Sequence, residues 1–233
     1  MIRKLLLLSG MLASLLYVGI DVLAAVRYPE YHSFSGQMVS ELMAKGAPTE
    51  RLVDPLFLLY GALMLGFAVG VWLSGTRGRV RVTGGLLFAY AATGLLGPTL
   101  YEMNVRGSGG DPSADIWHIA LTAVLVVFIV AAVATGASLH GRPFRLYSFA
   151  TLLIMAGFGA LTSFAARGLS AGAPTPWLGL AERVDIGAFL VWVAVLGASL
   201  LRTPSGAPAA ARTLAGREAP SLAPALGRGG AGV

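Results

Sequence analysis

The side chains of this sequence that could carry chemistry are a few histidines and carboxylates. The sequence has three histidines and no cysteine, which excludes disulfides, thiolate metal sites and cysteine nucleophiles. Imidazole and carboxylate groups together would supply the nitrogen and oxygen ligands that suit zinc. The candidates for such a group are His32, His118, Asp21, Glu41 and Asp185. No HxxxH, HExxH or other close spacing joins them, so we predict neither a metal nor a cofactor.

Nucleophilic catalysis has weaker support in the sequence. Ser33, Ser35 and Ser40 lie near His32, but no Gly-x-Ser-x-Gly elbow is present. We therefore assign no catalytic residue. An intramembrane enzyme, such as a metal-assisted lipid hydrolase, stays open as an alternative, and it requires His32, His118 and a carboxylate to converge.

The elements that must position these residues are long apolar segments. Hydrophobic residues make up 56% of the 233 residues and charged residues 12%, with a mean hydropathy of +0.74. Six stretches are long enough to cross a hydrocarbon core of about 30 Å, and none shows the period-2 alternation of a barrel strand. We predict an all-α integral membrane protein whose residues 1–201 form six spans, at about 5–26, 55–74, 83–101, 116–138, 147–166 and 184–201.

The charged residues separate by loop. Eleven of the 17 basic residues lie on the side of the termini: Arg3, Lys4, Arg77, Arg79, Arg81, Arg142, Arg145, Arg202, Arg212, Arg217 and Arg228. Ten of the 11 acidic residues lie toward the other side. The positive-inside rule then predicts cytoplasmic N- and C-termini in a prokaryotic plasma membrane. Because the basic residues form no patch on a soluble domain, we expect no nucleic-acid partner.

Both ends of the chain need separate interpretation. The start, MIRKLLLLSGMLASLL, resembles a signal peptide, but its apolar run is too long and contains Asp21, so we predict an uncleaved first helix. Residues 202–233 are rich in Ala, Gly and Pro with scattered Arg and have no periodic apolar face. We predict a disordered cytoplasmic tail there.

The loop between the first two spans is long enough for its own element. Met38, Val39, Leu42 and Met43 form an apolar stripe at helical spacing, opposite Gln37, Glu41 and Lys45. We predict a short amphipathic helix on the membrane surface or over the bundle, with Glu41 and Lys45 as an i,i+4 pair on a solvated face. Gly46 and Pro48 would end this helix, and the steps Asp54-Pro55 and Asp111-Pro112 would each begin the next one.

The polar residues near this side form a candidate binding cluster. Asp21 lies inside the first apolar run, where a charge must find a partner or water, and Arg183, His118 and Arg27 are the candidate partners. A structural ion pair is the alternative to a functional role for Asp21, as helix initiation is for Asp54 and a hydrogen-bonded tether is for His118. The predicted cluster is Asp21, His32, Glu41, Asp54, His118, Arg183 and Asp185.

Glycines provide small helix faces for close packing. They include Gly66-x-x-x-Gly70 and a pair at Gly157 and Gly159. Such faces support either contacts within the chain or a homo-oligomer.

Several segments resemble one prokaryotic family of multipass membrane proteins. These are RYPEYHSFSGQMVSELMAKGAPTERLVDPLF, DIWHIAL and GLAERVDIGAFLVW, and the most specific part is SELMAKGAP. The chain resembles, over about residues 5–201, the family catalogued as domain of unknown function 998, whose members often have Gly where this chain has Met43. The resemblance implies a six-helix membrane protein with no established activity and no assigned catalytic residue.

These patterns favour a binding protein over an enzyme. Acidic groups collect on one side, whereas the other side has only short basic connections. We predict a non-enzymatic, outward-facing membrane module that binds a lipid, a small solute or a partner at the polar cluster, with membrane lipids as expected partners. A small-solute transporter is a further alternative, although the scarcity of charge near the bilayer midplane argues against proton coupling.

Overall fold

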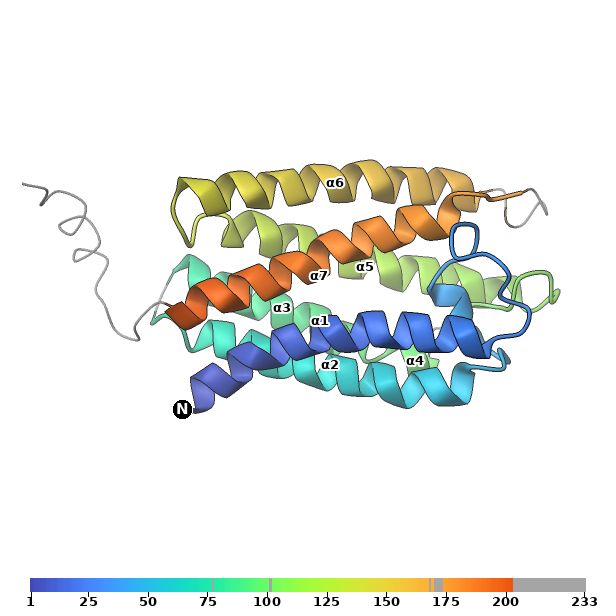
Figure 1. Cartoon of the computed structure of the whole chain (residues 1–233), viewed down its shortest axis with the longest axis horizontal. Helices are drawn as coiled ribbons and strands as arrows, with labels where there is room; N and C mark the ends of the chain where they lie inside the picture. Colours follow the sequence, from blue (N-terminus) through green and yellow to red (C-terminus); the bar gives the residue numbers. More distant parts are fainter. Residues whose placement is uncertain (77, 101, 168, 170–173, 203–233) are drawn as a thin grey trace, which may run out of the picture. The chain divides into compact units, whose positions relative to one another are not determined.

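The computed structural model describes residues 1–76, 78–100, 102–167, 169 and 174–202, all within one compact unit (Figure 1). The tail predicted to be disordered lies, from residue 203 onward, outside the described residues. The described part of the chain is helical and has no strand, apart from one isolated bridge between Lys45 and Asn104. The elements are α1 (Ile2–Arg27), the 3₁₀ helix η1 (Ser40–Met43), α2 (Glu50–Trp72), α3 (Arg79–Gly94), α4 (Gly97–Leu100), α5 (Pro112–Gly136), α6 (Arg142–Ala166) and α7 (Leu178–Arg202).

Five of these helices are long and apolar enough to cross a membrane: α1, α2, α5, α6 and α7. The segment predicted as the third span, 83–101, differs from the others. Its helix α3 has 16 residues, or about 24 Å at 1.5 Å per residue, and ends at Gly94. Pro98 has no N–H to donate to the carbonyl of Gly94, so the ladder cannot continue, and α4 follows as a separate short helix.

Hydropathy placed several helix starts too late, because the first turns contain polar residues. Helix α2 begins at Glu50 after Thr49, so the prediction that Asp54-Pro55 begins this helix is wrong, and Pro55 lies inside it. At α5 the same reasoning is confirmed. The Asp111 carboxylate accepts a hydrogen bond from the Ser113 N–H at 2.9 Å, and Pro112 is the first helical residue.

The helices neighbour one another in a ring, in the order α1, α2, α3, α5, α6 and α7, with α7 returning to α1 (Figure 1). Glycines allow the closest approaches. A Cβ added at Gly70 would lie 2.9 Å from the Leu6 backbone, and one at Gly84 would lie 2.8 Å from the Trp72 backbone. The Gly66-x-x-x-Gly70 face therefore packs on α1 of the same chain, whereas a homo-oligomer through other glycine faces stays a prediction.

Polar side chains join helices inside the apolar core. The Ser14 hydroxyl donates to the Leu190 carbonyl at 3.0 Å, and the fully buried Trp192 indole donates to the Ser148 hydroxyl at 3.0 Å. These two bonds hold α7 to α1 on one side and to α6 on the other. They fix the orientation of α7, whose N-terminal half has the charged residues considered below.

One end of the ring is covered by connecting segments, and we call it the capped end. It consists of the segments 28–49, 102–111 and 174–177 with the adjoining helix ends. The Lys45 N–H donates to the Met103 carbonyl at 2.8 Å, and the Leu180 N–H donates to the Ser35 carbonyl at 3.0 Å. Segments far apart in sequence therefore meet there.

The predicted amphipathic helix of the first loop is a single 3₁₀ turn, η1, within the capped end. Its i+3 hydrogen bonds run from the Glu41 N–H to the Met38 carbonyl and from the Leu42 N–H to the Val39 carbonyl. Met38, Val39 and Leu42 are buried, as the apolar stripe predicted. Glu41 is buried as well, with 4% of its surface exposed, so the prediction of a solvated polar face at Glu41 is wrong.

Candidate functional site

A bidentate ion pair between α7 and α1 stands at the centre of the capped end. The Nε and Nη2 groups of Arg183 donate to the two carboxylate oxygens of Asp21 at 2.9 and 2.8 Å. Both side chains are mostly buried, with 14% and 11% of their surfaces exposed. A paired, planar geometry of this kind is the strong form of the Arg–carboxylate bond. Of the three candidate partners for Asp21, Arg183 is the one that the structure places on it.

Arg183 also holds the first loop against α7. Its Nη1 group donates to the carbonyls of Phe34 at 2.7 Å and Gln37 at 2.9 Å, and its Nη2 group donates to the Tyr31 hydroxyl. The guanidinium carbon lies 4.2 Å from the centroid of the Phe34 ring. Burial raises the pKa of the Tyr31 hydroxyl to about 12, so this group stays protonated and donates onward to the Gln37 carbonyl. Every nitrogen of the Arg183 guanidinium group thus has an acceptor.

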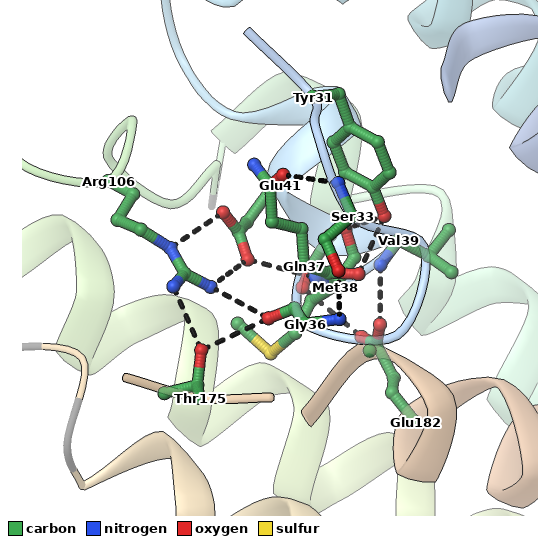
Figure 2. Close-up of polar contacts among 12 residues, drawn as sticks. Tyr31, Ser33, Gly36, Gln37, Met38, Val39, Glu41, Arg106, Thr175 and Glu182 are labelled. Atoms are coloured by element: carbon green, nitrogen blue, oxygen red, sulfur yellow. Dashed lines mark hydrogen bonds and ion pairs between the residues drawn. The ribbon is translucent and has the colours of Figure 1, made fainter. Parts of the chain in front are cut away.

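A second ion pair, between Arg106 and Glu41, holds the segment 102–111 to the first loop (Figure 2). The Nε and Nη2 groups of Arg106 donate to the two Glu41 oxygens at 2.9 and 2.6 Å. Its Nη1 group donates to the Thr175 hydroxyl at 2.9 Å, which in turn donates to the Gly36 carbonyl at 3.0 Å. Glu41 also accepts from the Met38 N–H at 2.8 Å. The expected Glu41–Lys45 pair is therefore replaced by a contact 65 residues away in sequence.

Glu182 faces this loop from α7, and the two hydrogen bonds that its carboxylate accepts within the described chain come from groups other than lysine or arginine. Its carboxylate accepts from the Val39 N–H and, at 3.2 Å, from the Ser40 hydroxyl (Figure 2). Both donors are uncharged. Because Glu182 also lines the cavity described next, it stands on the boundary between the capped end and that cavity.

A large cavity of about 870 Å³ lies inside the ring, with walls from α2, α3, α5, α6 and α7. Most of the wall is apolar and includes Leu125, Ile129, Leu152 and Phe189. Lining residues of α5 and α6 such as Val126 and Leu153 are exposed, so the cavity opens sideways between these two helices. Several polar lining residues lie toward the capped end: Ser40, Glu102, His118, Thr162, Ser163, Glu182 and Asp185. The wall also contains Thr122 and the tyrosines Tyr17, Tyr60 and Tyr90, of which Tyr60 and Tyr90 bind each other through their hydroxyls at 2.8 Å.

Two buried polar atoms of cavity-lining residues have no hydrogen-bond partner, namely Oδ1 of Asp185 and Oγ1 of Thr162. The Asp185 carboxylate lies against Gly159 of α6, where an added Cβ would lie 3.6 Å from Asp185 Oδ2. Thr162 lies one helical turn beyond Gly159 on the same face of α6. Buried polar groups almost always have partners in native proteins, so these two oxygens retain the capacity to accept a hydrogen bond.

Three further carboxylates approach one another beside the cavity. Ligand atoms of Glu50, Asp54 and Glu102 lie within 4.8 Å of one another, and Oδ1 of Asp54 is buried without a hydrogen bond. Partial burial, then repulsion from Asp54 and Glu50, raises the pKa of Glu102. In the described part of the chain this is the one group of three or more acidic, His or Cys residues close enough to share a metal ion, and it contains neither His32 nor His118. Such clusters are common without a metal.

Comparison with known proteins identifies the family. A family model described as "Protein of unknown function (DUF998)" matches residues 11–199. The chain belongs to the DUF998 family. The match confirms the predicted resemblance and includes every residue of the two ion pairs and of the cavity wall. Comparisons with curated proteins and with solved structures return no match. Together with the five apolar helices, membership supports an uncharacterised multi-pass membrane protein.

Within this DUF998 chain, the seven predicted site residues separate into four places. Asp21 pairs with Arg183, and Glu41 belongs to the neighbouring pair. His118 and Asp185 line the cavity, whereas Asp54 belongs to the acidic cluster. His32 is exposed, and its backbone N–H donates to the Gln37 side chain at 2.8 Å. The predicted single cluster is thus divided among the ion pairs of the capped end, the cavity, the acidic cluster and the exposed first loop.

Sequence reasoning missed three residues that matter here: Arg106, Thr162 and Glu182. Glu182 had a usable signal, because it lies three residues before Asp185 and so on the same helical face. Arg106 had none, since nothing near it in sequence indicates that it reaches Glu41. Thr162 lies in an apolar run, and its role depends on which face of α6 meets α7.

Proposed function

We propose that this chain is a six-span protein of the prokaryotic plasma membrane that binds the apolar chain of a lipid-like amphiphile in the cavity. Helices α3 and α4 together cover residues 79–100, which is enough for a sixth crossing if they act as one broken span. The capped end then faces outward, because most basic residues lie on the opposite side. Two of the basic residues at the capped end, Arg106 and Arg183, are also neutralised by ion pairs.

The observation that supports this function is the shape and polarity of the cavity. Its volume of about 870 Å³ is at the upper end of the range of about 300–1,000 Å³ that is usual for ligand pockets. Along α5 it extends from His118 to Val130, or about 18 Å at 1.5 Å per residue. Half of a hydrocarbon core of about 30 Å is of similar depth. An apolar wall of one leaflet's depth with polar groups at one end matches one chain of a lipid and its head.

Binding is favoured over hydrolysis by the same geometry. Four charged side chains already form ion pairs with each other, and the two arginines also donate to backbone carbonyls: Asp21, Arg183, Glu41 and Arg106. The lipid-hydrolase alternative needs His32 beside His118 and a carboxylate. In the described chain His32 is exposed in the first loop, and His118 lines the cavity.

The cavity can be tested with two glycines of α6. Gly159 lines the cavity, whereas a Cβ added at Gly157 would meet nothing within 4 Å. The probe is a hexadecanol with a photoreactive diazirine in its chain, applied to the full-length protein in nanodiscs. We expect labelled peptides from α5 and α6, with most of the labelling lost in Gly159→Leu and retained in Gly157→Leu. Equal labelling of both variants would contradict the proposal.

The orientation has its own test, because the chain has no cysteine. Lys45 is exposed in the first loop, so Lys45→Cys supplies a single thiol at the capped end. We expect a membrane-impermeant maleimide to label it from outside intact cells, and an Arg142→Cys variant to be labelled only after lysis. The reverse pattern would place the capped end in the cytoplasm.

A further inference from the structure

We infer that the cavity selects an amphiphile with a cationic amine head, which Asp185, Glu182 and Thr162 hold at the polar end. This inference rests on the proposed cavity function and adds the chemical class of the ligand. It depends on three observations: the charge of the lining, the unfilled acceptors, and the placement of these acceptors at one level of the cavity.

The lining of the cavity is acidic. Its charged side chains are Glu102, Glu182 and Asp185, and among the described residues that line it there is no lysine or arginine. A carboxylate taken out of water needs a positive charge or several donors nearby to offset the loss of hydration. The two arginines that could supply this charge are already saturated by Asp21, Glu41 and backbone carbonyls. Within the described lining, no lysine or arginine therefore neutralises these three acidic side chains, and an ammonium group would supply the missing positive charge.

The acceptors at the polar end suit an ammonium group. An ammonium has three N–H donors and no acceptor. Asp185 and Thr162 each present a buried oxygen without a partner, and Glu182 is bound only by the Val39 N–H and the Ser40 hydroxyl. A hydroxyl head would fill one of these acceptors, whereas an ammonium could fill three and also neutralise charge.

These three groups lie at nearly the same level. Asp185 contacts the Gly159 position, and Thr162 is one turn from Gly159 toward the capped end. Glu182 is one turn from Asp185 in the same direction on α7. Gly159 has no side chain to separate the carboxylate from the space between α6 and α7. Farther from the capped end, the lining is mostly apolar, with the mutually hydrogen-bonded Tyr60 and Tyr90 among Leu, Ile, Val and Phe side chains, so a chain attached to the amine would extend into the apolar part.

The same features disfavour other heads. A carboxylate or phosphate head would face three acidic residues with no basic residue in the described lining, and like charges at close range repel. A small free amine would satisfy the acceptors but leave most of the apolar volume unfilled. The chemistry thus commits to one occupant, a primary amine on a long apolar chain.

The test compares ligands that have the same 16-carbon chain but different head groups, using the full-length protein in nanodiscs. Hexadecylamine, hexadecanol and hexadecanoate compete with the photoreactive hexadecanol at pH 7, where an alkyl amine is charged. Charge-assisted hydrogen bonds are worth about 1.5–3 kcal/mol, so we expect the amine to bind at least about tenfold more tightly than the alcohol. Butylamine at the same concentration is expected not to compete.

Variants of single residues test which side chains cause the preference for the amine over the alcohol. Asp185→Asn should reduce the preference for amine over alcohol to near unity, and Thr162→Val should reduce it less. Glu30→Gln is the matched control, since it removes one exposed acidic charge outside the cavity lining, and it should keep the full preference. Thermal unfolding of each variant shows whether a lost preference reflects misfolding.

The outcomes separate this inference from the proposed function. Equal binding of amine and alcohol, tightest binding of hexadecanoate, or an unchanged preference in folded Asp185→Asn would each overturn the amine head and leave the cavity function intact. Competition by butylamine as strong as by hexadecylamine would overturn the requirement for a lipid chain. If no long-chain competitor displaces the probe, the proposed function fails as well.

Discussion

The capped end and the cavity adjoin along α7, but they differ in how their polar groups are paired. In the capped end, Arg183 and Arg106 each meet a carboxylate through two hydrogen bonds and use their remaining donors on backbone carbonyls or a hydroxyl. In the cavity, Asp185 and Thr162 have buried oxygens with no partner. A region whose polar groups satisfy each other is built to hold a shape. If the cavity holds the proposed ligand, substitutions should lower stability in the first region and affinity in the second.

The largest effect is expected from Arg183→Gln. This change leaves the Asp21 carboxylate buried without its partner and removes the Arg183 donor from the carbonyls of Phe34 and Gln37, of which Gln37 keeps the Tyr31 hydroxyl. Breaking a buried pair from one side costs about 3–5 kcal/mol, or a fall in Tm of roughly 6–20 °C, measured by thermal unfolding in detergent. Arg51→Gln removes an exposed arginine at the same end and should change Tm by no more than about 2 °C.

A double variant sharpens this result. Adding Asp21→Asn to Arg183→Gln removes the stranded charge, so part of the lost stability should return, while the loop carbonyls still lack the Arg183 donor. No recovery would mean that the ion pair is not what Arg183 contributes.

The second effect decides between two partners for Glu41. Its carboxylate is bound by Arg106, whose side chain is 32% exposed, and by the Met38 N–H. We expect Glu41→Gln to lower the free energy of unfolding by about 2 kcal/mol, and Lys45→Ala by less than about 0.5 kcal/mol. Chemical denaturation of the two variants measures the difference. A larger loss of unfolding free energy in Lys45→Ala than in Glu41→Gln would support the local i,i+4 pair and contradict the long-range contact.

Substitutions of the cavity groups should leave the stability unchanged or raise it. Asp185→Asn and Thr162→Val alter groups that have unsatisfied buried oxygens in the ligand-free protein. Removing such a group relieves a desolvation penalty, so the free energy of unfolding should stay the same or rise by up to about 1 kcal/mol. Thermal unfolding without added ligand checks this. A loss comparable to that of Glu41→Gln would show that the cavity groups, too, are structural.

The smallest effect concerns pH. Partial burial and the neighbouring Asp54 and Glu50 raise the pKa of Glu102 in the folded state. Folding therefore favours the protonated form, and stability is lost as pH rises from the ordinary Glu value through the raised one. Glu102→Gln removes this loss, so Tm at pH 7 should rise by about 1–3 °C, with a smaller gain near pH 4. A fall in Tm at pH 7 would mean that the three carboxylates are held together by a cation.

Much of the fold could be predicted from local sequence. Apolar runs of about 20 residues have few alternatives to a membrane helix, and a carboxylate inside such a run must find a partner, which made Arg183 one of three candidates for Asp21 before the structure selected it. The third segment was harder, because hydropathy does not register the backbone break that Pro98 causes. Asp54-Pro55 misled for a related reason. The pair suits a helix start, but the chain before it could form another turn, beginning after Thr49.

The candidate site was harder to predict than the fold. Glu41 had a local partner at helical spacing, and the actual partner, Arg106, lies in another loop. The unfilled state of Asp185 is not a property of any short segment either. It depends on Gly159 of α6 facing α7, and on Arg183 of the same helix being paired with Asp21. Local patterns therefore identified the charged residues but not which of them neutralise each other.

The pairing of Asp21 with Arg183 also constrains how the protein is made. The two residues are 162 positions apart, on the first and last long helices. At about 5–20 residues per second, a ribosome adds the arginine roughly 10–30 s after the aspartate. During that interval the first helix resides in the translocon or bilayer with an unmatched carboxylate, and the loop that follows has no anchor. A nascent chain that stops before the last helix therefore keeps an unpaired acid in its first helix.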